Sequence, residues 1–435
     1  MGTSWANMAR LLRRTGFGVT GQAVDAALPH GIPATVSAML AADPAADPGA
    51  RATPLPHLSY VPPVGRSAST QQRGDHITAQ RAQLTTLMTW WLRRMAAVEQ
   101  PFGEKLTFCW HNHFATSGSK VRQATWLAAQ NERLRTLGRG NFRTLALTML
   151  TDAAMLVWLD GQKNVAGAAN ENLAREFMEL FTLGHGDGYT ETDVREGARA
   201  LTGWRVLSDG SAHLVARLHD SGSKTVLGVT GNLDAGGFCD AVLAQPGSAR
   251  YLATRWWQQL ASDTPPSPAV VDRLVAAYGP SRSMSGMLSA LLASDEFFAA
   301  AGTAVLTPVE WLLGAVRTLQ VQLTGDAVVK QIAGGLRGLG QLPFYPPSVA
   351  GWPSGQAWLS TAAGELRLRV ALLLVAKGNL DAVRTASPAS RLDVTSHFLG
   401  LDGWSNATLT VLRDQVSDPH RLVAVALNSP EYLTA

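Results

Sequence analysis

The chain has 435 residues, of which 46% are hydrophobic and 16% are charged. These values exclude a disordered or highly charged protein and leave enough apolar side chains for a sizeable core. The two cysteines, Cys109 and Cys239, are too few for a disulfide framework or a four-thiolate metal site. The net charge of +4 is weak evidence for nucleic acid, because only six of the 37 basic residues are lysine and scattered arginines commonly form ion pairs. We therefore expect no nucleic-acid partner.

The sequence contains no apolar run of about 18 residues, the length that a membrane-spanning helix needs. The segment 1–14 places its arginines after a short mixed stretch, and no apolar region follows them. This order differs from that of a secretory signal peptide. We expect no membrane span and, from the absence of a signal, a cytoplasmic location.

Apolar residues recur at helical spacing along most of the chain, which predicts a mainly α-helical fold. We predict one large multi-helix globular domain that spans residues 1–435. The clearest helical stretches are residues 84–99, 124–137, 142–149, 174–183 and 192–201.

Three segments depart from the helical pattern. Residues 43–80 begin with closely spaced prolines and small residues, which predicts a long surface or lid loop. Residues 205–237 alternate apolar and polar side chains, which predicts a small β-hairpin. Residues 334–365 combine glycine, proline and aromatic residues, which indicates a structured loop.

Two helix ends share one pattern. Residues 294–297 (Ser-Asp-Glu-Phe) and 429–432 (Ser-Pro-Glu-Tyr) each follow an apolar helical stretch. A serine at this position can cap the next helix. We interpret the two segments as similar helical corners.

The densest group of polar side chains lies in residues 170–184 (Asn-Glu-Asn-Leu-Ala-Arg-Glu-Phe-Met-Glu-Leu-Phe-Thr-Leu-Gly). On a helix, Asn172, Glu176 and Glu179 share one face. Two carboxylates within one turn suit general acid/base catalysis, because their repulsion raises the pKa of one of them, and they also suit cation binding. The alternative is a solvated acidic face that pairs with Arg175.

A second polar group is Trp110-His111-Asn112-His113. On a strand the two histidines could chelate one metal ion, whereas on a helix they point about 200° apart. The residues upstream of them have a helical pattern, so we do not expect a two-histidine chelate. We expect one histidine to enter a polar pocket and the other to hold a backbone carbonyl.

The polar and aromatic blocks together resemble the bacterial family known as domain of unknown function 1800. The resemblance covers essentially the whole chain, and block 170–184 is its most specific part. It implies a mainly helical protein, and many members resemble exported proteins, so export stays open. The matching residues lie in 9–18, 104–106, 110–114, 140–142, 159–160, 170–184, 189–204, 219–220, 224, 227–228, 340–341, 346–347, 351–353 and 429–431.

Polar side chains gathered in a mostly apolar helical chain are costly unless they line a cleft. Our first hypothesis is therefore a hydrolase without a cofactor that acts on a glycan or another small molecule. The predicted catalytic residues are Glu176, Glu179, Asp160 and His113. The predicted substrate-binding residues are Trp110, His111, Asn170, Glu171, Asn172, Arg175, Trp204, His219, Asp220 and Trp352.

Two other hypotheses fit the same residues. In the second, the chain is a metal-dependent enzyme, for example an oxidoreductase. A divalent metal ion is then held by Glu176, Glu179, Asp160 and one histidine. In the third, the chain is a non-catalytic binding or assembly protein, and the polar helix belongs to a buried ion-pair network.

Overall fold

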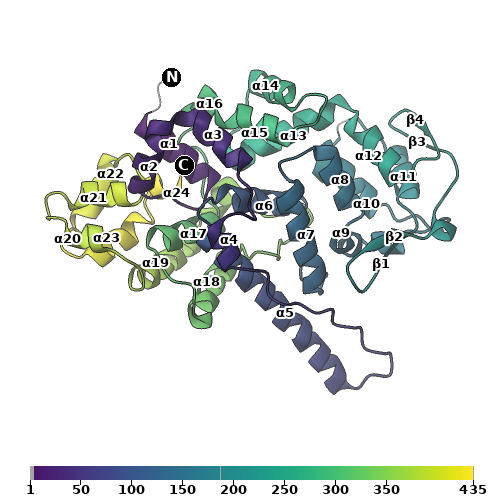
Figure 1. Cartoon of the computed structure of the whole chain (residues 1–435), viewed down its shortest axis with the longest axis horizontal. Helices are drawn as coiled ribbons and strands as arrows, with labels where there is room; N and C mark the ends of the chain where they lie inside the picture. The colour runs from purple at the N-terminus through teal and green to yellow at the C-terminus, as the bar shows by residue number, and fades with distance from the viewer. Residues whose placement is uncertain (1–3, 187, 435) are drawn as a thin grey trace.

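A computed structural model describes residues 4–186 and 188–434. The fold is mainly α-helical, as predicted, and it adds two small antiparallel sheets (Figure 1). The buried apolar side chains form two hydrophobic cores. Helix α6 (Phe102–His113) contributes to both, because Leu106 and Trp110 lie in the first core and Phe108 lies in the second.

The first core is built mainly from the N-terminal helices and the middle of the chain. Its elements are α1 (Trp5–Thr15), α2 (Gly21–Ala27), α3 (Gly31–Ala41), α8 (Phe142–Leu150), α9 (Ala153–Trp158), α10 (Asn172–Glu176), the π-helix η3 (Phe177–Thr182), α11 (Glu191–Ala200), α12 (Ala235–Leu243), α13 (Pro246–Leu260), α14 (Pro268–Tyr278), α15 (Met284–Leu292) and α16 (Asp295–Ala299).

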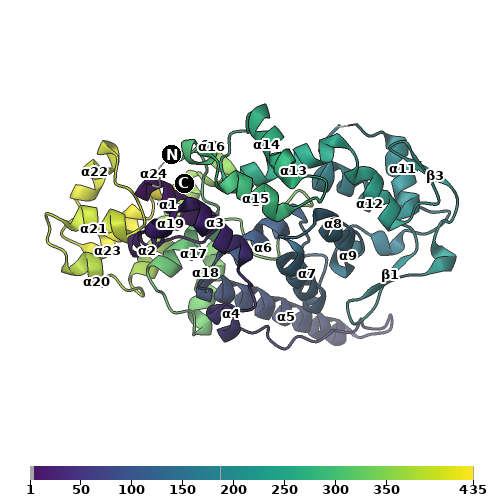
Figure 2. The same cartoon turned by 45° about the horizontal axis from the view of Figure 1, so that its top comes forward.

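The second core joins two long early helices to the C-terminal third of the chain. Figures 1 and 2 show α20 to α23 at one end of the molecule and the sheets at the other. The elements around this core are α5 (Thr70–Ala97), α7 (Ala124–Leu137), α17 (Pro308–Thr318), α18 (Asp326–Gly338), α19 (Thr361–Val375), α20 (Asp381–Thr385), α21 (Arg391–Phe398), α22 (Asn406–Arg413), α23 (Pro419–Ala426) and α24 (Pro430–Leu433).

The predicted hairpin region contains two hairpins. In the first, β1 (Trp204–Val206) pairs with β2 (Ala212–Leu214), and in the second, β3 (Lys224–Val226) pairs with β4 (Val229–Gly231). The second turn consists of Leu227 and Gly228, both with positive φ (50° and 82°). Two such residues match the right-handed twist of the strands that they connect.

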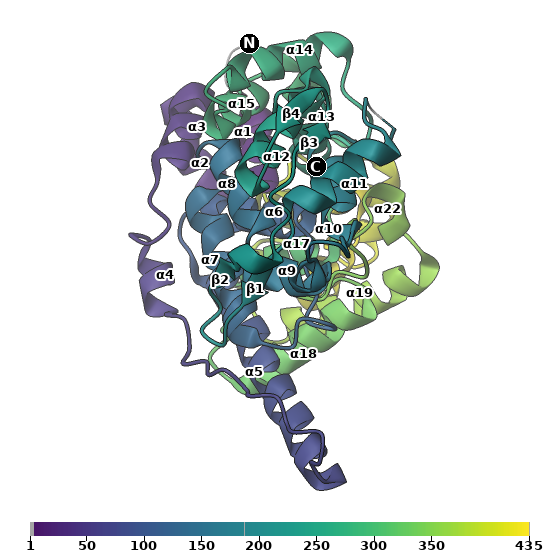
Figure 3. The same cartoon turned by 90° about the vertical axis from the view of Figure 1, so that its right-hand side faces the viewer.

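The prediction of one long loop over residues 43–80 is wrong, because two helices occupy parts of this segment. Pro48–Ala52 forms the short helix α4, and α5 begins at Thr70, where Ser69 and Gln72 form a reciprocal capping box. The first half of α5 has no apolar stripe, so the periodicity of the sequence did not reveal it. This half projects from the body as an arm, with residues 53–69 alongside (Figure 3).

The predicted structured loop over residues 334–365 is shorter than expected. Helix α18 continues to Gly338 and α19 begins at Thr361, so the irregular part lies between them and includes the 3-10 turn Gly355–Trp358. Phe344 anchors this loop in the second core, where its ring lies 4.9 Å from that of Trp91.

Both predicted helical corners are present. The Ser294 hydroxyl accepts a hydrogen bond from the backbone N–H of Phe297 at 3.2 Å, and Ser429 does the same for Tyr432 at 3.2 Å. Each serine therefore starts a short helix whose aromatic residue is buried, one in each core.

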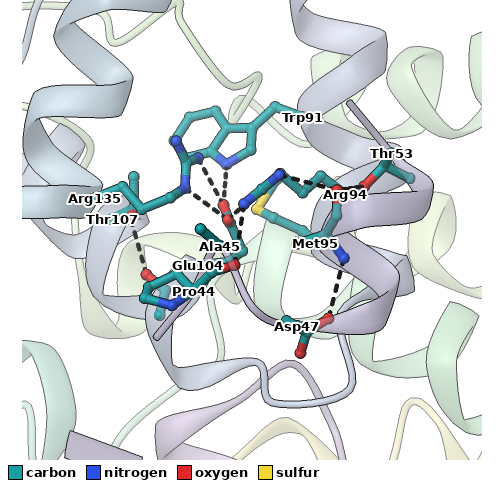
Figure 4. A network of polar contacts seen from close by, with 12 residues as sticks. Pro44, Ala45, Asp47, Thr53, Trp91, Arg94, Met95, Glu104, Thr107 and Arg135 are labelled. Carbon is teal, nitrogen blue, oxygen red and sulfur yellow. Dashed lines mark hydrogen bonds and ion pairs between the residues drawn. The ribbon is translucent and has the colours of Figure 1, made fainter. Parts of the chain in front are cut away.

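A buried carboxylate joins three helices where the two cores meet (Figure 4). Glu104 on α6 accepts hydrogen bonds from Arg94 on α5 (2.6 Å), from Arg135 on α7 (2.7 and 2.9 Å) and from the indole of Trp91 (2.8 Å). Burial acts to raise the pKa of Glu104, but Arg135 and Arg94 outweigh it and hold the pKa below its usual value. This network fixes α6, the helix that carries both predicted histidines.

Candidate functional site

The polar block 170–184 folds as α10 followed directly by the π-helix η3. Glu176 is the last residue of α10, and Glu179 lies in the π-helical turn. The wider turn is visible in the bond from the Leu183 N–H to the Met178 carbonyl, which spans five residues at 2.7 Å. Short π-helical segments in proteins occur frequently at functional sites.

The buried side of this segment is fixed by two side chains. Tyr251 on α13 donates its hydroxyl proton to the Leu180 carbonyl at 2.6 Å. His113 Nε2 lies 2.9 Å from the Phe181 carbonyl, and because a carbonyl only accepts, Nε2 carries the proton. These contacts fix the side of the π-helical turn that faces the core. Glu176 and Glu179 are only partly buried.

Glu176 is a carboxyl group that forms no ion pair with the described residues. Burial raises its pKa, and the charge of Glu179 raises it further. The charges of Arg175 and then of His185 act against this shift without reversing it. The Arg175 guanidinium is itself bound to both oxygens of Glu191 at 2.7 Å and to Glu171 at 2.8 Å. None of the residues in 4–186 and 188–434 donates a hydrogen bond to the Glu176 side chain.

Glu179 has its own partner. Its carboxylate pairs with Nδ1 of His185, whose side chain is 74% exposed, whereas the Glu179 side chain is 22% exposed. Tyr189 is half-buried, and burial and then the charge of Glu179 raise the pKa of its phenol. The site therefore consists of Glu176, Glu179, His185 and Tyr189.

His185 and Tyr189 were not predicted from the sequence. They lie in the stretch 184–189, Gly-His-Gly-Asp-Gly-Tyr, in which Gly184, Gly186 and Gly188 have φ values of 94°, 73° and 77°. Left-handed glycines let the chain turn back beside the helix that it has just left. In the sequence, the alternation of glycine with polar or aromatic residues over 184–189 was the one pattern that could have indicated His185 and Tyr189. Asp187 lies outside the described residues.

The predicted catalytic residue Asp160 lies apart from this pair. It adopts a left-handed conformation (φ 58°) and forms ion pairs with Lys120 at 2.7 Å and Lys163 at 2.8 Å. Burial acts to raise its pKa, but the two lysines outweigh it and lower the pKa of Asp160. No ion pair or hydrogen bond links it to Glu176 or Glu179 among the described residues.

The two histidines of α6 diverge, as the helical prediction requires. His111 Nε2 accepts a hydrogen bond from the backbone N–H of Phe344 at 3.1 Å, while His113 holds the Phe181 carbonyl. Burial lowers the pKa of each imidazole to about 3, and the charge of Arg255 adds to the shift of His113. Both rings are neutral, and His113 touches the candidate site only through the backbone of the π-helix.

Two of the three tryptophans predicted to bind substrate are buried. Trp110 is 0% exposed and donates its indole N–H to the Gly138 carbonyl at 2.8 Å. Trp352 is 5% exposed and its ring stacks on Phe108 at 5.7 Å between centroids. Trp204, on β1, is half-buried. The structure thus uses Trp110 and Trp352 in the cores, and leaves Trp204 partly accessible.

The asparagines before α10 shape the chain that enters it. The Asn170 backbone N–H donates to the Asn164 side chain at 2.9 Å, and the Asn170 side chain accepts from the Asn172 N–H at 3.0 Å. Asn172 itself is exposed. These bonds set the start of the helix that presents Glu176.

His219 and Asp220 belong to a separate cluster between α11 and the hairpins. Asp220 binds Arg199 at 2.8 Å, and Arg199 also binds Glu196. His219 Nδ1 lies 3.0 Å from the Thr202 carbonyl. The structure gives these two residues no contact with Glu176 or Glu179 in the part of the chain that it describes.

Within residues 4–186 and 188–434, no three or more His, Cys, Asp or Glu side chains are arranged to hold a metal ion. None of the described helices is both long and apolar enough to cross a membrane.

The comparisons with known proteins identify the family. Residues 10–434 match the family described as "Protein of unknown function (DUF1800)". The chain therefore belongs to the DUF1800 family, as its sequence motifs suggested. No curated protein and no solved structure matches it.

Proposed function

We propose that the chain is a hydrolase in which Glu176 and Glu179 perform general acid/base catalysis, with a glycan as the preferred class of substrate. The observation that supports this most is the state of Glu176. Its pKa is raised by burial and by Glu179, and no described cation or donor binds its carboxyl group. A carboxyl group with a raised pKa keeps its proton closer to neutral pH, as a general acid must.

The two carboxyl groups take different roles because their surroundings differ. Glu176 donates its proton to the oxygen of the leaving group as the scissile bond breaks. Glu179, paired with His185, accepts a proton from the water molecule that attacks the substrate. Water thereby supplies the hydroxyl group of one product. Glu179 then releases the proton that it accepted to solvent, and Glu176 regains a proton from solvent, which restores both groups.

The glycan assignment rests on one partly accessible aromatic ring, that of Tyr189, whose phenol is influenced by the charge of Glu179. Aromatic faces suit the apolar faces of sugar rings. Because Trp110 and Trp352 are buried, Tyr189 replaces them in the proposed site. Direct attack by a water molecule that Glu179 activates inverts the stereochemistry and requires about 6.5 to 9.5 Å between the two carboxyl groups in the substrate complex. A separation of about 5 Å would instead make Glu179 the nucleophile of a retaining enzyme.

The test is hydrolysis of a glycan panel by the full chain and by the variants Glu176→Gln and Glu179→Gln. Glu365→Gln is a matched control, because Glu365 is an exposed glutamate on α19 that pairs with Arg369. We expect each site variant to remain folded, with a melting temperature no lower than that of the parent chain, and to lose activity by about a hundredfold or more, whereas the control should retain its activity. Equal activity in all four proteins would refute the proposal.

The ion-pair-network hypothesis has less support. It requires Glu176 and Glu179 to bind arginine, whereas the neighbouring Arg175 binds Glu171 and Glu191 instead. For the metal-dependent hypothesis, metal analysis of protein purified without a histidine tag is the direct test. A stoichiometric transition metal would favour it over the proposed mechanism.

A further inference from the structure

One cavity of the described chain is an open groove of about 860 Å³, and none of the candidate catalytic residues lines it. It lies between α2 and α3 on one side and the segment 99–103 on the other, and α17 contributes Arg317 and Thr318. Its wall is largely apolar and includes Ala34, Ala38 and Phe102. Ligand sites in proteins are typically apolar cavities of about 300 to 1,000 Å³ that contain a few polar groups.

Arg317 is the strongest polar group of the groove. Its Nη1 atom donates to the carbonyls of Met95, Ala96 and Val98 at 3.2, 2.8 and 2.7 Å. Among the described residues Arg317 donates hydrogen bonds from Nη1 alone, and neither Nε nor Nη2 has an acceptor there. Two N–H-bearing atoms of a guanidinium that lines the groove therefore have no hydrogen-bond acceptor within the described chain.

The carboxylates that line the groove do not neutralise Arg317. Asp47 accepts hydrogen bonds from the backbone N–H groups of Ala50 (3.0 Å), Glu99 (3.2 Å) and Gln100 (2.8 Å). It forms no ion pair with Arg317, although its charge partly opposes the effect of burial on the arginine. The side chains of Asp43 and Glu99 are exposed, where water and salt screen their charge.

We propose that this groove binds an unbranched aliphatic carboxylic acid, with the alkyl chain against the wall of α3 and the carboxylate on Nε and Nη2 of Arg317. An apolar surface of this volume favours an alkyl chain, and an arginine with two free donors favours a planar carboxylate that accepts two parallel hydrogen bonds. This site is independent of the proposed hydrolase site.

Three ligands with the same alkyl chain and different head groups test the assignment. Dodecanoate, dodecanol and dodecylammonium are titrated into the full chain below their micellar concentrations, and binding is measured by calorimetry. We expect dodecanoate to bind on the order of tenfold more tightly than dodecanol, because the carboxylate carries a charge opposite to that of Arg317 and accepts two hydrogen bonds from it, whereas the hydroxyl group is neutral and has one oxygen. Dodecylammonium should bind most weakly. Tightest binding of the ammonium ligand would assign the site to Asp43 and Glu99 and overturn the proposal.

A chain-length series tests the apolar part. Each added CH₂ that enters the groove should increase affinity about fourfold, as far as the groove extends. An affinity that does not depend on chain length from octanoate to dodecanoate would mean that the alkyl chain stays in water, and the proposal would fail.

Variants locate the site. Ala38→Trp fills the groove from α3, and Ser37→Trp is its control, because Ser37 is an exposed neighbour on the same helix that does not line the groove. We expect only the first to abolish binding of dodecanoate. Arg317→Met should lower the affinity for dodecanoate to that for dodecanol. Arg317→Lys should retain part of the preference for dodecanoate over dodecanol. If Arg317→Met does not fold, as judged by thermal melting, the comparison of Ala38→Trp with Ser37→Trp still decides whether the groove is the site.

Discussion

Arg13, on the first helix of the chain, donates a hydrogen bond from Nη2 to the backbone carbonyl of Tyr432 at 2.9 Å. One turn earlier, Arg10 donates from Nε to the carbonyl of Phe297 at 2.7 Å. Each guanidinium also lies over the ring of its aromatic partner, 5.8 Å and 4.8 Å from the centroid. Helix α1 thus binds the two similar helical corners in the same way and links both hydrophobic cores.

Arg13→Ala should destabilise the protein by about 2 kcal/mol, because the carbonyls of Glu431, Tyr432 and Thr434 all lose a charged donor. Denaturation by urea, followed by circular dichroism, measures the change. Arg421→Ala is the control, since Arg421 is exposed on α23 and its change should cost less than about 0.5 kcal/mol. Similar losses in both variants would contradict a linking role for Arg13.

Glu104→Gln should destabilise the protein by about 3 to 5 kcal/mol, because it leaves the buried guanidinium groups of Arg94 and Arg135 without their shared counter-ion. The control Glu132→Gln removes only the exposed partner of Arg135, so it should cost less than about 1 kcal/mol. Urea denaturation of both variants and the parent chain gives the comparison. A loss in Glu104→Gln no larger than in Glu132→Gln would show that the network does not stabilise the fold.

The stabilisation that Glu104 provides should be lost as the pH falls. Its pKa in the folded protein is below the ordinary value of 4.5, so the unfolded chain binds this proton more tightly. The stabilisation is therefore complete above about pH 4.5 and is lost as the pH falls further, through the lowered pKa of the folded state. Melting temperatures between pH 3 and 6 should fall less steeply in Glu104→Gln. A parallel fall in both proteins would show that other groups dominate acid unfolding.

Glu176→Gln should stabilise the protein at neutral pH, whereas Glu104→Gln should destabilise it. The folded-state pKa of Glu176 is raised, so its charged form is disfavoured by burial and by Glu179. The folded state is favoured most below the unfolded pKa of about 4.5 and loses this advantage as the pH rises through the raised value. The gain in melting temperature should appear at pH 7 and disappear near pH 4. A lower melting temperature at pH 7 would mean that the Glu176 carboxylate makes stabilising contacts.

If the proposed hydrolysis is found, its rate should fall on the alkaline side as Glu176 loses its proton. The profile of kcat against pH in the parent chain should have this limb, and any residual activity of Glu176→Gln should lack it. The raised pKa of Glu176 places the limb above the range of an ordinary glutamate. An alkaline limb that persists unchanged in Glu176→Gln would assign the proton to another group.

The sequence by itself determined the mainly helical fold, five of its helical stretches and the polar block that holds Glu176 and Glu179. It also predicted the two helical corners at Ser294 and Ser429 and the divergence of the histidines on α6. These features depend on local spacing and capping, which any window of the sequence contains. The family motifs likewise lie within continuous blocks.

Only the tertiary structure decided which polar and aromatic groups meet. It buries Trp110 and Trp352, pairs Asp160 with two lysines, and places His185 and Tyr189 beside Glu179. Burial and charge pairing arise between elements far apart in the chain, so no local spacing specifies them. The excess of arginine over lysine is explained in the same way. In the folded protein, arginine side chains such as those of Arg10 and Arg13 reach backbone carbonyls of distant helices, which the sequence alone does not show.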